Sequence, residues 1–444
     1  MPEVLSMTKS VCPVCLKVVQ AKRAVGEDGF VYLQKTCPEH GDFSALIWEG
    51  SAQDYLNWND AGGGKDTPPN PLPAERGCPY DCGLCEDHER PCCCVLLELT
   101  NRCNLRCPVC FASAGEGEPK DLSLEEIARQ YDMLMERGGP FNIQLSGGEP
   151  TLREDLPEIA ALGREKGFTF FQLNTNGLRL AEEPGYARKL KDAGVSCVFL
   201  QFDGLRDETY QTLRGRPLLK QKLAAVERCA DADLPVVLVP TVAPGVNDGE
   251  LGDILNFAIE RMPCVRGVHF QPVSYFGRCG LPAPSRRLTI PRMLRLIEEQ
   301  TEGRMKASDF GGGGAESPYC SFHASYLRQE DGSLKALPRR RGQCCCVKSK
   351  DARDFVSRQW GASRLKLKRK GGAGMTETSS LDAFLESVHL RTFAVSGMLF
   401  QDAYTLDLER LRRCYICEVD SARGMVPFCA YNLTAVDGRA LYRT

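Results

Sequence analysis

The sequence of 444 residues has little net charge and lacks long apolar runs. No uninterrupted apolar run approaches the ~20 residues that cross a bilayer, and the first nine residues contain no apolar segment of the kind that directs secretion. A formal net charge of −2 gives no overall indication of nucleic acid or an anionic membrane as a partner. We therefore expect a cytoplasmic protein without a transmembrane segment, and no nucleic acid as a partner.

Cysteine, by contrast, is abundant, with 23 residues that mostly stand in clusters. Without a secretion signal, clustered cysteines indicate metal sites rather than disulfides, and they point to a reducing, anaerobic cell. At about 100 to 200 residues per domain, the length predicts two to four domains. A hydrophobic content of 43% is sufficient for a core.

Three cysteines in one short loop follow an apolar run at residues 95–97. They are Cys103, Cys107 and Cys110, in the spacing Cys-x3-Cys-x2-Cys. A four-iron four-sulfur cluster (4Fe-4S) held by three cysteines keeps one iron without a protein ligand, and such an iron can bind a substrate. The spacing alone is shared with structural zinc sites and with clusters that a fourth cysteine completes.

The run Gly147, Gly148, Glu149 and Pro150 comes next, and with the cysteine loop it resembles the signature of the radical S-adenosylmethionine (radical SAM) superfamily. The resemblance implies an enzyme whose open iron chelates S-adenosylmethionine. One electron from the reduced cluster then releases a 5′-deoxyadenosyl radical that abstracts hydrogen from a substrate. The glycines would let the backbone approach the methionine moiety, and Glu149 would accept from its amino group. Taken alone, the run could be an ordinary turn.

The same resemblance implies further cofactor-binding residues at the ends of strand-like runs. Asn174 and Asn176 fall where members of the superfamily contact the methionine or adenosine moieties, and Gln201 and Asp203 fall near the ribose or carboxylate. Arg214 could clamp the carboxylate. The Asn-Gly and Asp-Gly pairs here are also common turn formers.

Strand-like and helical patterns alternate between residues 95 and 305. We expect six strands, at residues 95–99, 142–145, 168–173, 196–202, 236–242 and 267–273. A helix over residues 123–136 begins with the capping box of Ser123 and Glu126. This alternation predicts an α/β protein with a parallel sheet and crossover helices. The resemblance implies a TIM-like partial (β/α)6 barrel, with function at the C-terminal strand ends.

Residues 1–50 predict a small β-rich knuckle of the zinc-ribbon or rubredoxin type. Its expected metal ligands are Cys12, Cys15, Cys37 and His40. A unit this small needs a metal to stabilise it. The pattern does not separate zinc from a mononuclear iron. Residues 51–76 are rich in glycine and proline and predict a linker, which leads into a cysteine-rich module that ends at residue 94.

That module is expected to hold an auxiliary 4Fe-4S cluster. Its loop repeats the central spacing with Cys78, Cys82 and Cys85. If the segment is extended, Cys93 points away from Cys92 and Cys94. The resemblance implies Cys93 as the fourth ligand, because similar proteins have a cysteine at that place ahead of the strand. The rival assignment, in which this loop binds S-adenosylmethionine's cluster, is disfavoured since no strand precedes it.

Residues 306–444 are expected to form a C-terminal auxiliary iron-sulfur domain. The predicted ligands of this second auxiliary cluster are Cys320, Cys414, Cys417 and Cys429. A cysteine triplet at residues 344–346 competes for the fourth position. Asp-Gly pairs at residues 331–332 and 437–438 predict two hairpins.

Two basic runs, at residues 339–341 and 364–370, are typical of a solvated face. An acidic substrate or partner is the alternative explanation for them. After the barrel, a helix with an early proline is expected over residues 289–302, beginning at Thr289.

Several segments resemble a narrower group, the radical SAM (seleno)protein TrsS family. They are residues 37–41, 82–85, 142–151, 170–180 and 427–432. This resemblance implies an uncharacterised reaction beside a partner methyltransferase. A more distant similarity, to archaeal tetraether lipid synthase, implies radical carbon-carbon coupling of lipid chains.

The leading hypothesis is an oxidoreductase-like radical enzyme that abstracts hydrogen from an unidentified substrate. It would receive electrons from a donor such as flavodoxin or ferredoxin and would use one or two auxiliary clusters. A non-catalytic iron-sulfur or zinc-binding electron-transfer scaffold is the alternative from another class, and the run at residues 147–150 argues against it.

Overall fold

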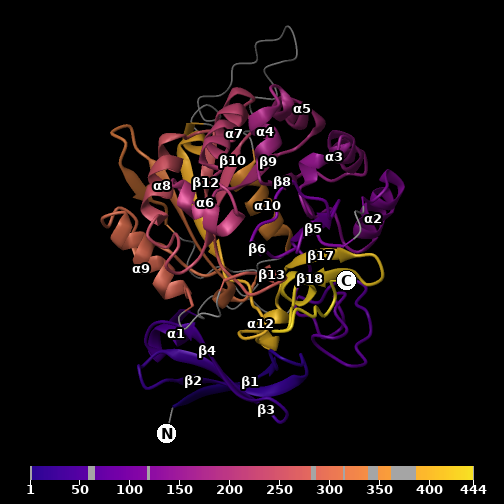
Figure 1. Ribbon diagram of the computed structural model, residues 1–444, viewed down its shortest axis with the longest axis vertical. Helices are drawn as coiled ribbons and strands as arrows, with labels where there is room; N and C mark the ends of the chain where they lie inside the picture. The colour runs from indigo at the N-terminus through magenta and orange to yellow at the C-terminus, as the bar shows by residue number, and fades with distance from the viewer. Residues whose placement is uncertain are drawn as a thin grey trace.

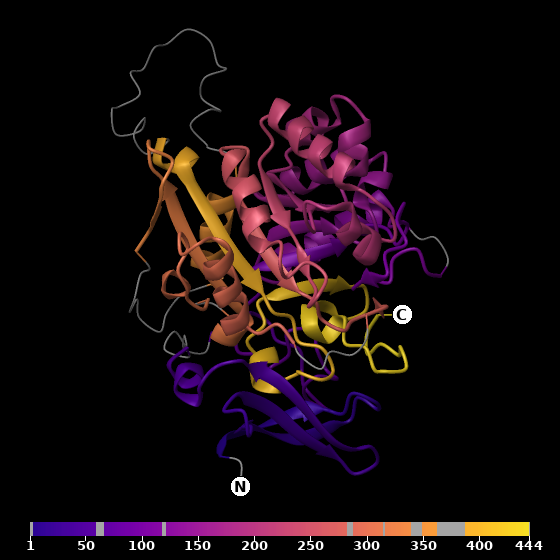
Figure 2. The ribbon, with the colours of Figure 1, turned by 60° about the vertical axis from the view of Figure 1, so that its left-hand side comes forward.

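The computed structural model describes residues 3–58, 66–117, 121–281, 287–313, 316–338, 349–361 and 387–443. Both predicted basic runs and the cysteine triplet lie outside these residues. A small N-terminal sheet lies below a larger sheet whose outer side is covered by helices (Figures 1 and 2). Within the described residues, no helix is long and apolar enough to cross a membrane.

Six parallel neighbours form the centre of the large sheet, in the order β12, β10, β9, β8, β7 and β5. In chain order they are β5 (Cys94–Glu98), β7 (Asn142–Ser146), β8 (Phe171–Thr175), β9 (Cys197–Gln201), β10 (Val236–Val239) and β12 (Val265–Pro272). A short strand, β11 (Thr241–Val242), continues β10 along β12. This order confirms the predicted six-unit partial barrel. The strands could be predicted because parallel strands are buried on both faces and therefore appear in the sequence as apolar runs.

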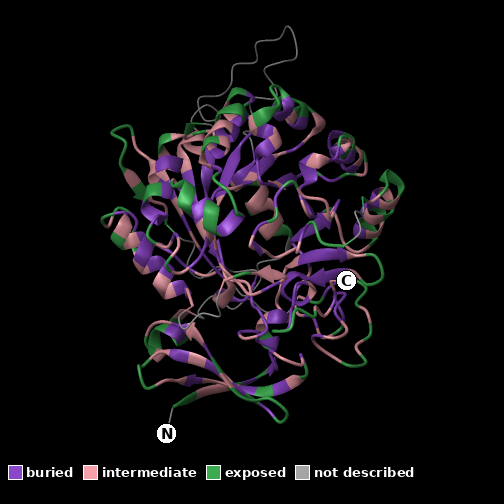
Figure 3. Cartoon of the chain, viewed as in Figure 1, coloured by how far each residue is buried: buried purple, intermediate pink, exposed green. Residues whose placement is uncertain are grey.

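Helices connect these strands and bury one face each against the sheet (Figure 3). They are α2 (Leu124–Glu136), α3 (Leu156–Glu165), α4 (Leu178–Glu182), α5 (Tyr186–Ala193), α6 (Asp207–Arg214), α7 (Leu219–Asp231), α8 (Leu251–Glu260) and α9 (Ile290–Gln300). The predicted capping box of α2 is present, since Ser123 accepts from the Glu126 amide and Glu126 accepts from the Ser123 amide. Thr289 precedes α9, but its hydroxyl accepts from the Glu49 amide instead of capping the helix.

Strands from the C-terminal third extend the barrel sheet at both edges. At one edge, β16 (Thr392–Met398) pairs in parallel with β12, and β14 (Ser321–Arg328) and β15 (Leu334–Ala336) follow as antiparallel strands. At the other edge, β17 (Ile416–Asp420) pairs with β5 and is followed by β18 (Gly424–Pro427). The described strands after residue 306 thus continue the barrel sheet, because they pair with edges that the barrel leaves open. The C-terminal auxiliary iron-sulfur domain over residues 306–444 stays a prediction.

The first predicted hairpin is present between β14 and β15, whereas the second is reduced to an isolated bridge between Thr434 and Ala440. Between β15 and β16 the chain forms α10 (Ser349–Trp360). Trp360 packs with Phe170 and Val237 under the barrel. The contact is close, since a β-carbon on Gly267 would lie 2.8 Å from the Trp360 ring. This helix closes the N-terminal end of the barrel.

The small sheet consists of four consecutive antiparallel strands: β1 (Val4–Val11), β2 (Val18–Val25), β3 (Val31–Cys37) and β4 (Gly41–Trp48). It is fastened to the C-terminal third, where Asp407 accepts from Thr8 at 2.9 Å and from Arg23 at 2.8 Å. A helix, α1 (Ala52–Trp58), forms inside the predicted linker. It forms because Tyr55 stacks on Tyr319 with ring centroids 4.4 Å apart, a contact between distant segments.

Candidate active site and metal centre

A cavity of about 250 Å³ lies at the C-terminal ends of the barrel strands. It is lined by ten of the residues predicted from the sequence: Cys103, Cys107, Cys110, Gly147, Gly148, Glu149, Asn174, Asn176, Gln201 and Arg214. Two predicted cofactor-binding residues, Pro150 and Asp203, are buried but are not part of this lining. The structure therefore gathers residues from five separate segments around one space, as expected of a barrel enzyme.

The two glycines hold the Gly-Gly-Glu-Pro run against the backbone of the cysteine loop. Gly148 donates to the Thr100 carbonyl at 2.7 Å, and Glu149 donates to the Arg102 carbonyl at 2.8 Å. A β-carbon on Gly147 would lie 2.3 Å from the Thr100 oxygen, and one on Gly148 would lie 2.1 Å from the Arg102 oxygen. The glycines are thus already required by contact with the loop, whereas the sequence prediction ascribed them to the approach of the methionine moiety.

The three thiols of the loop share the cavity and form no disulfide. The end of the loop is fixed by a short ladder, in which β6 (Val109–Cys110) pairs with β13 (Arg278–Cys279) and Arg278 donates to the Cys107 carbonyl at 2.7 Å. Burial raises the pKa of Cys103 to about 12, so binding of a cluster has to displace a proton there. This donor set fits a four-iron cluster with three cysteine ligands.

Glu149 joins the ends of two neighbouring strands. One carboxylate oxygen accepts from the Thr151 and Thr175 hydroxyls, each at 2.6 Å, and the other accepts from the Asn176 amide at 2.7 Å. The side chain is almost fully buried and also lines the cavity. Glu149 therefore sets the position of Asn176, and its predicted contact with a methionine amino group stays a prediction.

Arg214 and Asp203 form a buried ion pair beside the cysteine loop. Arg214 Nε and Nη2 donate to the two Asp203 oxygens at 2.7 and 2.6 Å, and Nη1 donates to the Val109 carbonyl at 3.0 Å. The fork of the guanidinium that was predicted to clamp a ligand carboxylate is thus taken by Asp203. Asp203 acts on the cavity through Arg214 rather than by lining it.

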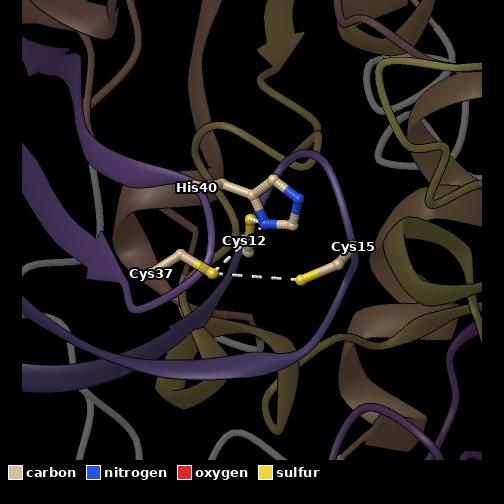
Figure 4. A group of neighbouring side chains, drawn as sticks. All are labelled: Cys12, Cys15, Cys37 and His40. Atoms are coloured by element: carbon tan, nitrogen blue, oxygen red, sulfur yellow. Dashed lines mark hydrogen bonds between the residues drawn. The ribbon is translucent and has the colours of Figure 1, made fainter.

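The second candidate site lies at one end of the N-terminal sheet (Figure 4). The ligand atoms of Cys12, Cys15, Cys37 and His40 all lie within 4.8 Å of one another. His40 Nδ1 is 3.4 Å from the Cys37 sulfur and 3.6 Å from the Cys12 sulfur, and the Cys15 and Cys37 sulfurs are 4.0 Å apart. Three sulfurs and one imidazole nitrogen at this separation fit one tetrahedral metal ion.

The chain resembles known proteins over both sites and over most of its length. Residues 97–258 match the model of the radical SAM superfamily, and residues 4–49 match that of the HMPTM N-terminal zinc ribbon domain. The 7,8-dihydro-6-hydroxymethylpterin dimethyltransferase of Methanocaldococcus jannaschii is 36% identical over 96% of this chain and 93% of its own length. The chain belongs to the radical SAM superfamily, in the family of this dimethyltransferase.

Other radical SAM proteins match only part of the chain. The GTP 3′,8-cyclase of Paenarthrobacter nicotinovorans is 35% identical over 46% of this chain and 58% of its own length. The solved structure of Streptococcus suis SuiB bound to S-adenosylmethionine covers 48% of this chain and 47% of its own, with 14% identity and a TM-score of 0.41. Membership of this superfamily makes the protein an enzyme, so the electron-transfer scaffold considered above was a wrong alternative.

One residue of this radical SAM site was missed by the sequence analysis. Lys222 of α7 is fully buried, and its ammonium donates to the Asn176 carbonyl at 2.5 Å and to Gln201 Oε1 at 3.2 Å. Burial lowers its pKa to about 8. It supports two cavity residues from behind, and nothing in the sequence distinguishes it from the other lysines of an amphipathic helix.

We predict that Lys222→Met weakens S-adenosylmethionine binding about tenfold, because Asn176 and Gln201 each lose a hydrogen bond. Calorimetry under anaerobic conditions measures this. The effect on stability depends on pH. The unfolded state binds more protons than the folded state between pH 8 and 10.5, so wild-type stability rises relative to the variant across this window. Near pH 10.5, denaturant titration should show the variant less stable by about 1–3 kcal/mol. An unchanged cofactor affinity would contradict the supporting role.

For the N-terminal metal centre, we predict that Cys37→Ser lowers the bound metal by one equivalent per chain, because the sulfur lies within reach of both His40 and Cys15. Elemental analysis of zinc and iron measures the loss and identifies the metal. Cys229→Ser is the matched control, since Cys229 is buried in α7 away from the ribbon. Equal metal in the Cys37 variant and wild type would rule out this ligand set.

Several of the cysteines predicted for auxiliary clusters lie near one another, beside the paired strands β5 and β17. A hydrogen bond to Cys78 and burial raise the pKa of the Cys82 thiol, and Cys85 adds to the rise. Burial raises the pKa of Cys414 to about 12, with contributions from Cys320 and Cys92. The structure thus brings Cys82 together with Cys78 and Cys85, and Cys414 together with Cys320 and Cys92.

Between these groups lies Cys417, whose pKa is raised by burial and by a hydrogen bond to Cys92. Cys429 completes the second group, since its pKa is raised by burial and by the neighbouring Cys414 and Cys320 thiols.

Cys93, the predicted fourth ligand, has a different neighbourhood. Its sulfur lies 3.8 Å from that of Cys94, away from the Cys82 loop, whereas Cys92 lies beside Cys417. The prediction assumed an extended chain from residue 92, but β5 begins only at Cys94. The alternation of side chains therefore does not apply to Cys92 and Cys93.

Proposed function

We propose that this radical SAM enzyme methylates a reduced pterin: one S-adenosylmethionine is cleaved reductively, and a second would supply the methyl group and leave as S-adenosylhomocysteine. The observation that supports this most is the similarity over nearly the full length to a protein named 7,8-dihydro-6-hydroxymethylpterin dimethyltransferase. A pterin is a flat nitrogen heterocycle with several hydrogen-bond donors and acceptors on its edge. The cavity offers six amide side chains among its lining: Gln144, Gln172, Asn174, Asn176, Gln201 and Gln271.

In this proposal, the residues around the cavity have distinct roles. The cysteine loop would hold a four-iron cluster, which would supply the electron for the reductive cleavage of S-adenosylmethionine. Gly147 and Gly148 keep the loop and the Gly-Gly-Glu-Pro run in contact. Glu149 and Lys222 hold Asn176 at the cavity wall, and Arg214 holds the end of the loop through the Val109 carbonyl.

We further propose one or two auxiliary 4Fe-4S clusters, held by the two cysteine groups near β5 and β17, with electrons delivered by flavodoxin or ferredoxin. Zinc, or else a mononuclear iron, occupies the N-terminal ribbon. If the chain itself transfers the methyl groups, the separate methyltransferase partner implied by the TrsS resemblance is not required. The closer likeness to the TrsS family stays a prediction.

Lipid-chain coupling, the alternative drawn from tetraether lipid synthase, is less well supported by the cavity. A hydrocarbon chain leaves amide groups without hydrogen-bond partners, at a cost of about 1–3 kcal/mol for each buried group. The lining contains Gln271, whose side-chain amide makes no hydrogen bond with the residues that the structure describes. This residue favours a polar substrate.

The test is an anaerobic incubation of the reconstituted, dithionite-reduced protein with S-adenosylmethionine and 7,8-dihydro-6-hydroxymethylpterin. We expect 5′-deoxyadenosine and a pterin that is heavier by one or two methyl groups, both measured by mass spectrometry. Omission of the reductant should prevent both products. If 5′-deoxyadenosine forms while every pterin stays unmethylated, the enzyme is a radical SAM protein with another substrate.

A further inference from the structure

The cavity has a deeper part below the residues assigned to S-adenosylmethionine. It is lined by side chains that point inward from the middle of the strands, among them Gln144 of β7, Phe199 of β9 and His269 of β12. Phe199 packs edge to face against Trp360, with ring centroids 5.9 Å apart, and this contact closes the deeper part of the cavity from below. The cavity is therefore closed at its deeper end, and a ligand can lie above that end.

His269 presents one ring nitrogen to this space. Its Nδ1 lies 2.8 Å from the Ser396 hydroxyl of the neighbouring strand β16, and its ring lies against Phe199 with centroids 6.0 Å apart. Among the described residues, none forms a hydrogen bond with its Nε2. Burial lowers the pKa of His269 to about 4, so the imidazole is neutral at pH 7.

Gln271 follows two residues later on the same strand and lines the same space. Its backbone amide is paired with the Pro240 carbonyl, but its side-chain amide makes no hydrogen bond with the residues that the structure describes. An amide side chain donates and accepts side by side, which matches the edge of a cyclic amide. The other amides of this region differ, since Gln172 and Asn174 are already bonded to each other at 2.7 Å.

The opposite wall is aromatic. Phe428 lies at its centre, with ring centroids 4.3 Å from Phe400, 5.4 Å from Phe111 and 6.1 Å from Phe276, and all four line the cavity. Phe400 follows β16 and Phe428 follows β18, whereas Phe111 follows β6 and Phe276 precedes β13, so the C-terminal third supplies part of the wall that the six-stranded barrel lacks. A flat ring can stack on this wall while its edge reaches β12.

We propose that His269 and Gln271 form a substrate subsite that recognises an uncharged, planar heterocycle by its cyclic amide edge. Gln271 pairs with the amide edge, and the neutral imidazole of His269 binds an adjacent polar group through Nε2. Ser396 is a positioning residue, because it fixes the ring through Nδ1. The location of this subsite rests on the proposed function, and the assignment adds which side chains bind the substrate.

The experiment measures binding to the reconstituted protein saturated with S-adenosylmethionine, by calorimetry without reductant. The probes are 7,8-dihydro-6-hydroxymethylpterin, guanine, which has a similar cyclic amide edge, and adenine, which lacks it. We expect Gln271→Leu and His269→Phe each to weaken the binding of pterin about tenfold, the effect of one lost hydrogen bond. The affinity for S-adenosylmethionine and its uncoupled cleavage should change less than twofold.

Gln329→Leu is the matched control, because Gln329 lies in the β14 to β15 hairpin outside the cavity. Unchanged pterin affinity in both cavity variants would overturn the subsite and leave the proposed function standing. Binding of guanine but not pterin, weakened by both variants, would support the subsite and refute the pterin substrate. Adenine bound as tightly as pterin would overturn recognition of the amide edge. Gln271→Leu keeps the test valid if His269→Phe does not fold.

Discussion

Replacement of Cys103, Cys107 and Cys110 together by alanine is expected to reduce formation of 5′-deoxyadenosine to background. The three thiols line the cavity, and no other described cysteine does. Without them a four-iron cluster has no ligands at this position, so no electron can reach the sulfonium there. Product analysis by mass spectrometry measures the activity, and metal analysis should show a loss of about four iron atoms per chain.

The control for this variant replaces three cysteines outside the cavity, Cys197, Cys229 and Cys264. None of these three cysteines lines the cavity, and Cys197 and Cys229 are fully buried, as expected of small core residues. This control should keep its iron and its activity if it folds. Continued formation of 5′-deoxyadenosine by the cavity variant would place the catalytic cluster elsewhere, for example at the Cys78 loop.

Replacement of Cys414 and Cys417 by alanine is expected to remove about four iron and four sulfide per chain and to leave uncoupled S-adenosylmethionine cleavage in place. Both residues lie among the second group of thiols, near Cys320 and Cys92, and neither lines the cavity. A cluster bound there by four thiolates has no open iron, so its loss should stop methylation but not the first cleavage step. Mössbauer spectroscopy and sulfide analysis measure the number of clusters.

The matched control is Cys93→Ala, whose sulfur lies beside Cys94 and outside both thiol groups. It should retain all clusters if the neighbourhoods seen in the structure define the ligands. A loss of iron from this variant would restore the ligand set predicted from the sequence. Equal iron in wild type and the Cys414 and Cys417 variant would mean that the C-terminal cysteines bind no cluster.

Much of the fold could be predicted because the barrel strands are signalled locally. Buried parallel strands appear as short apolar runs, and the predicted run at residues 196–202 contains β9 (Cys197–Gln201). The capping box of Ser123 is equally local, since its two partners are three residues apart. The edges of the sheet were not predicted, because β16 and β17 pair with strands more than a hundred residues earlier.

The candidate site shows the same division. The cysteine loop and the Gly-Gly-Glu-Pro run were recognisable as motifs, but the reason for the glycines is a contact with the carbonyls of Thr100 and Arg102. The sequence did not indicate a role for Lys222, because this role depends on a contact with the Asn176 carbonyl of another segment. His269 and Gln271 can be recognised in the sequence as polar residues at alternate positions of an apolar strand. In a barrel such residues point into the lumen.

The sequence by itself therefore determined the superfamily, the six-unit barrel and the four residues that gather at the candidate N-terminal metal centre. Each of these depends on residues that are close in the chain or on a regular spacing. Only the tertiary structure decided the neighbours of Cys92 and Cys93, the union of the C-terminal third with the barrel sheet, and the aromatic wall opposite His269. These depend on contacts between distant segments, whose geometry is set by the packing of the whole core rather than by local pattern.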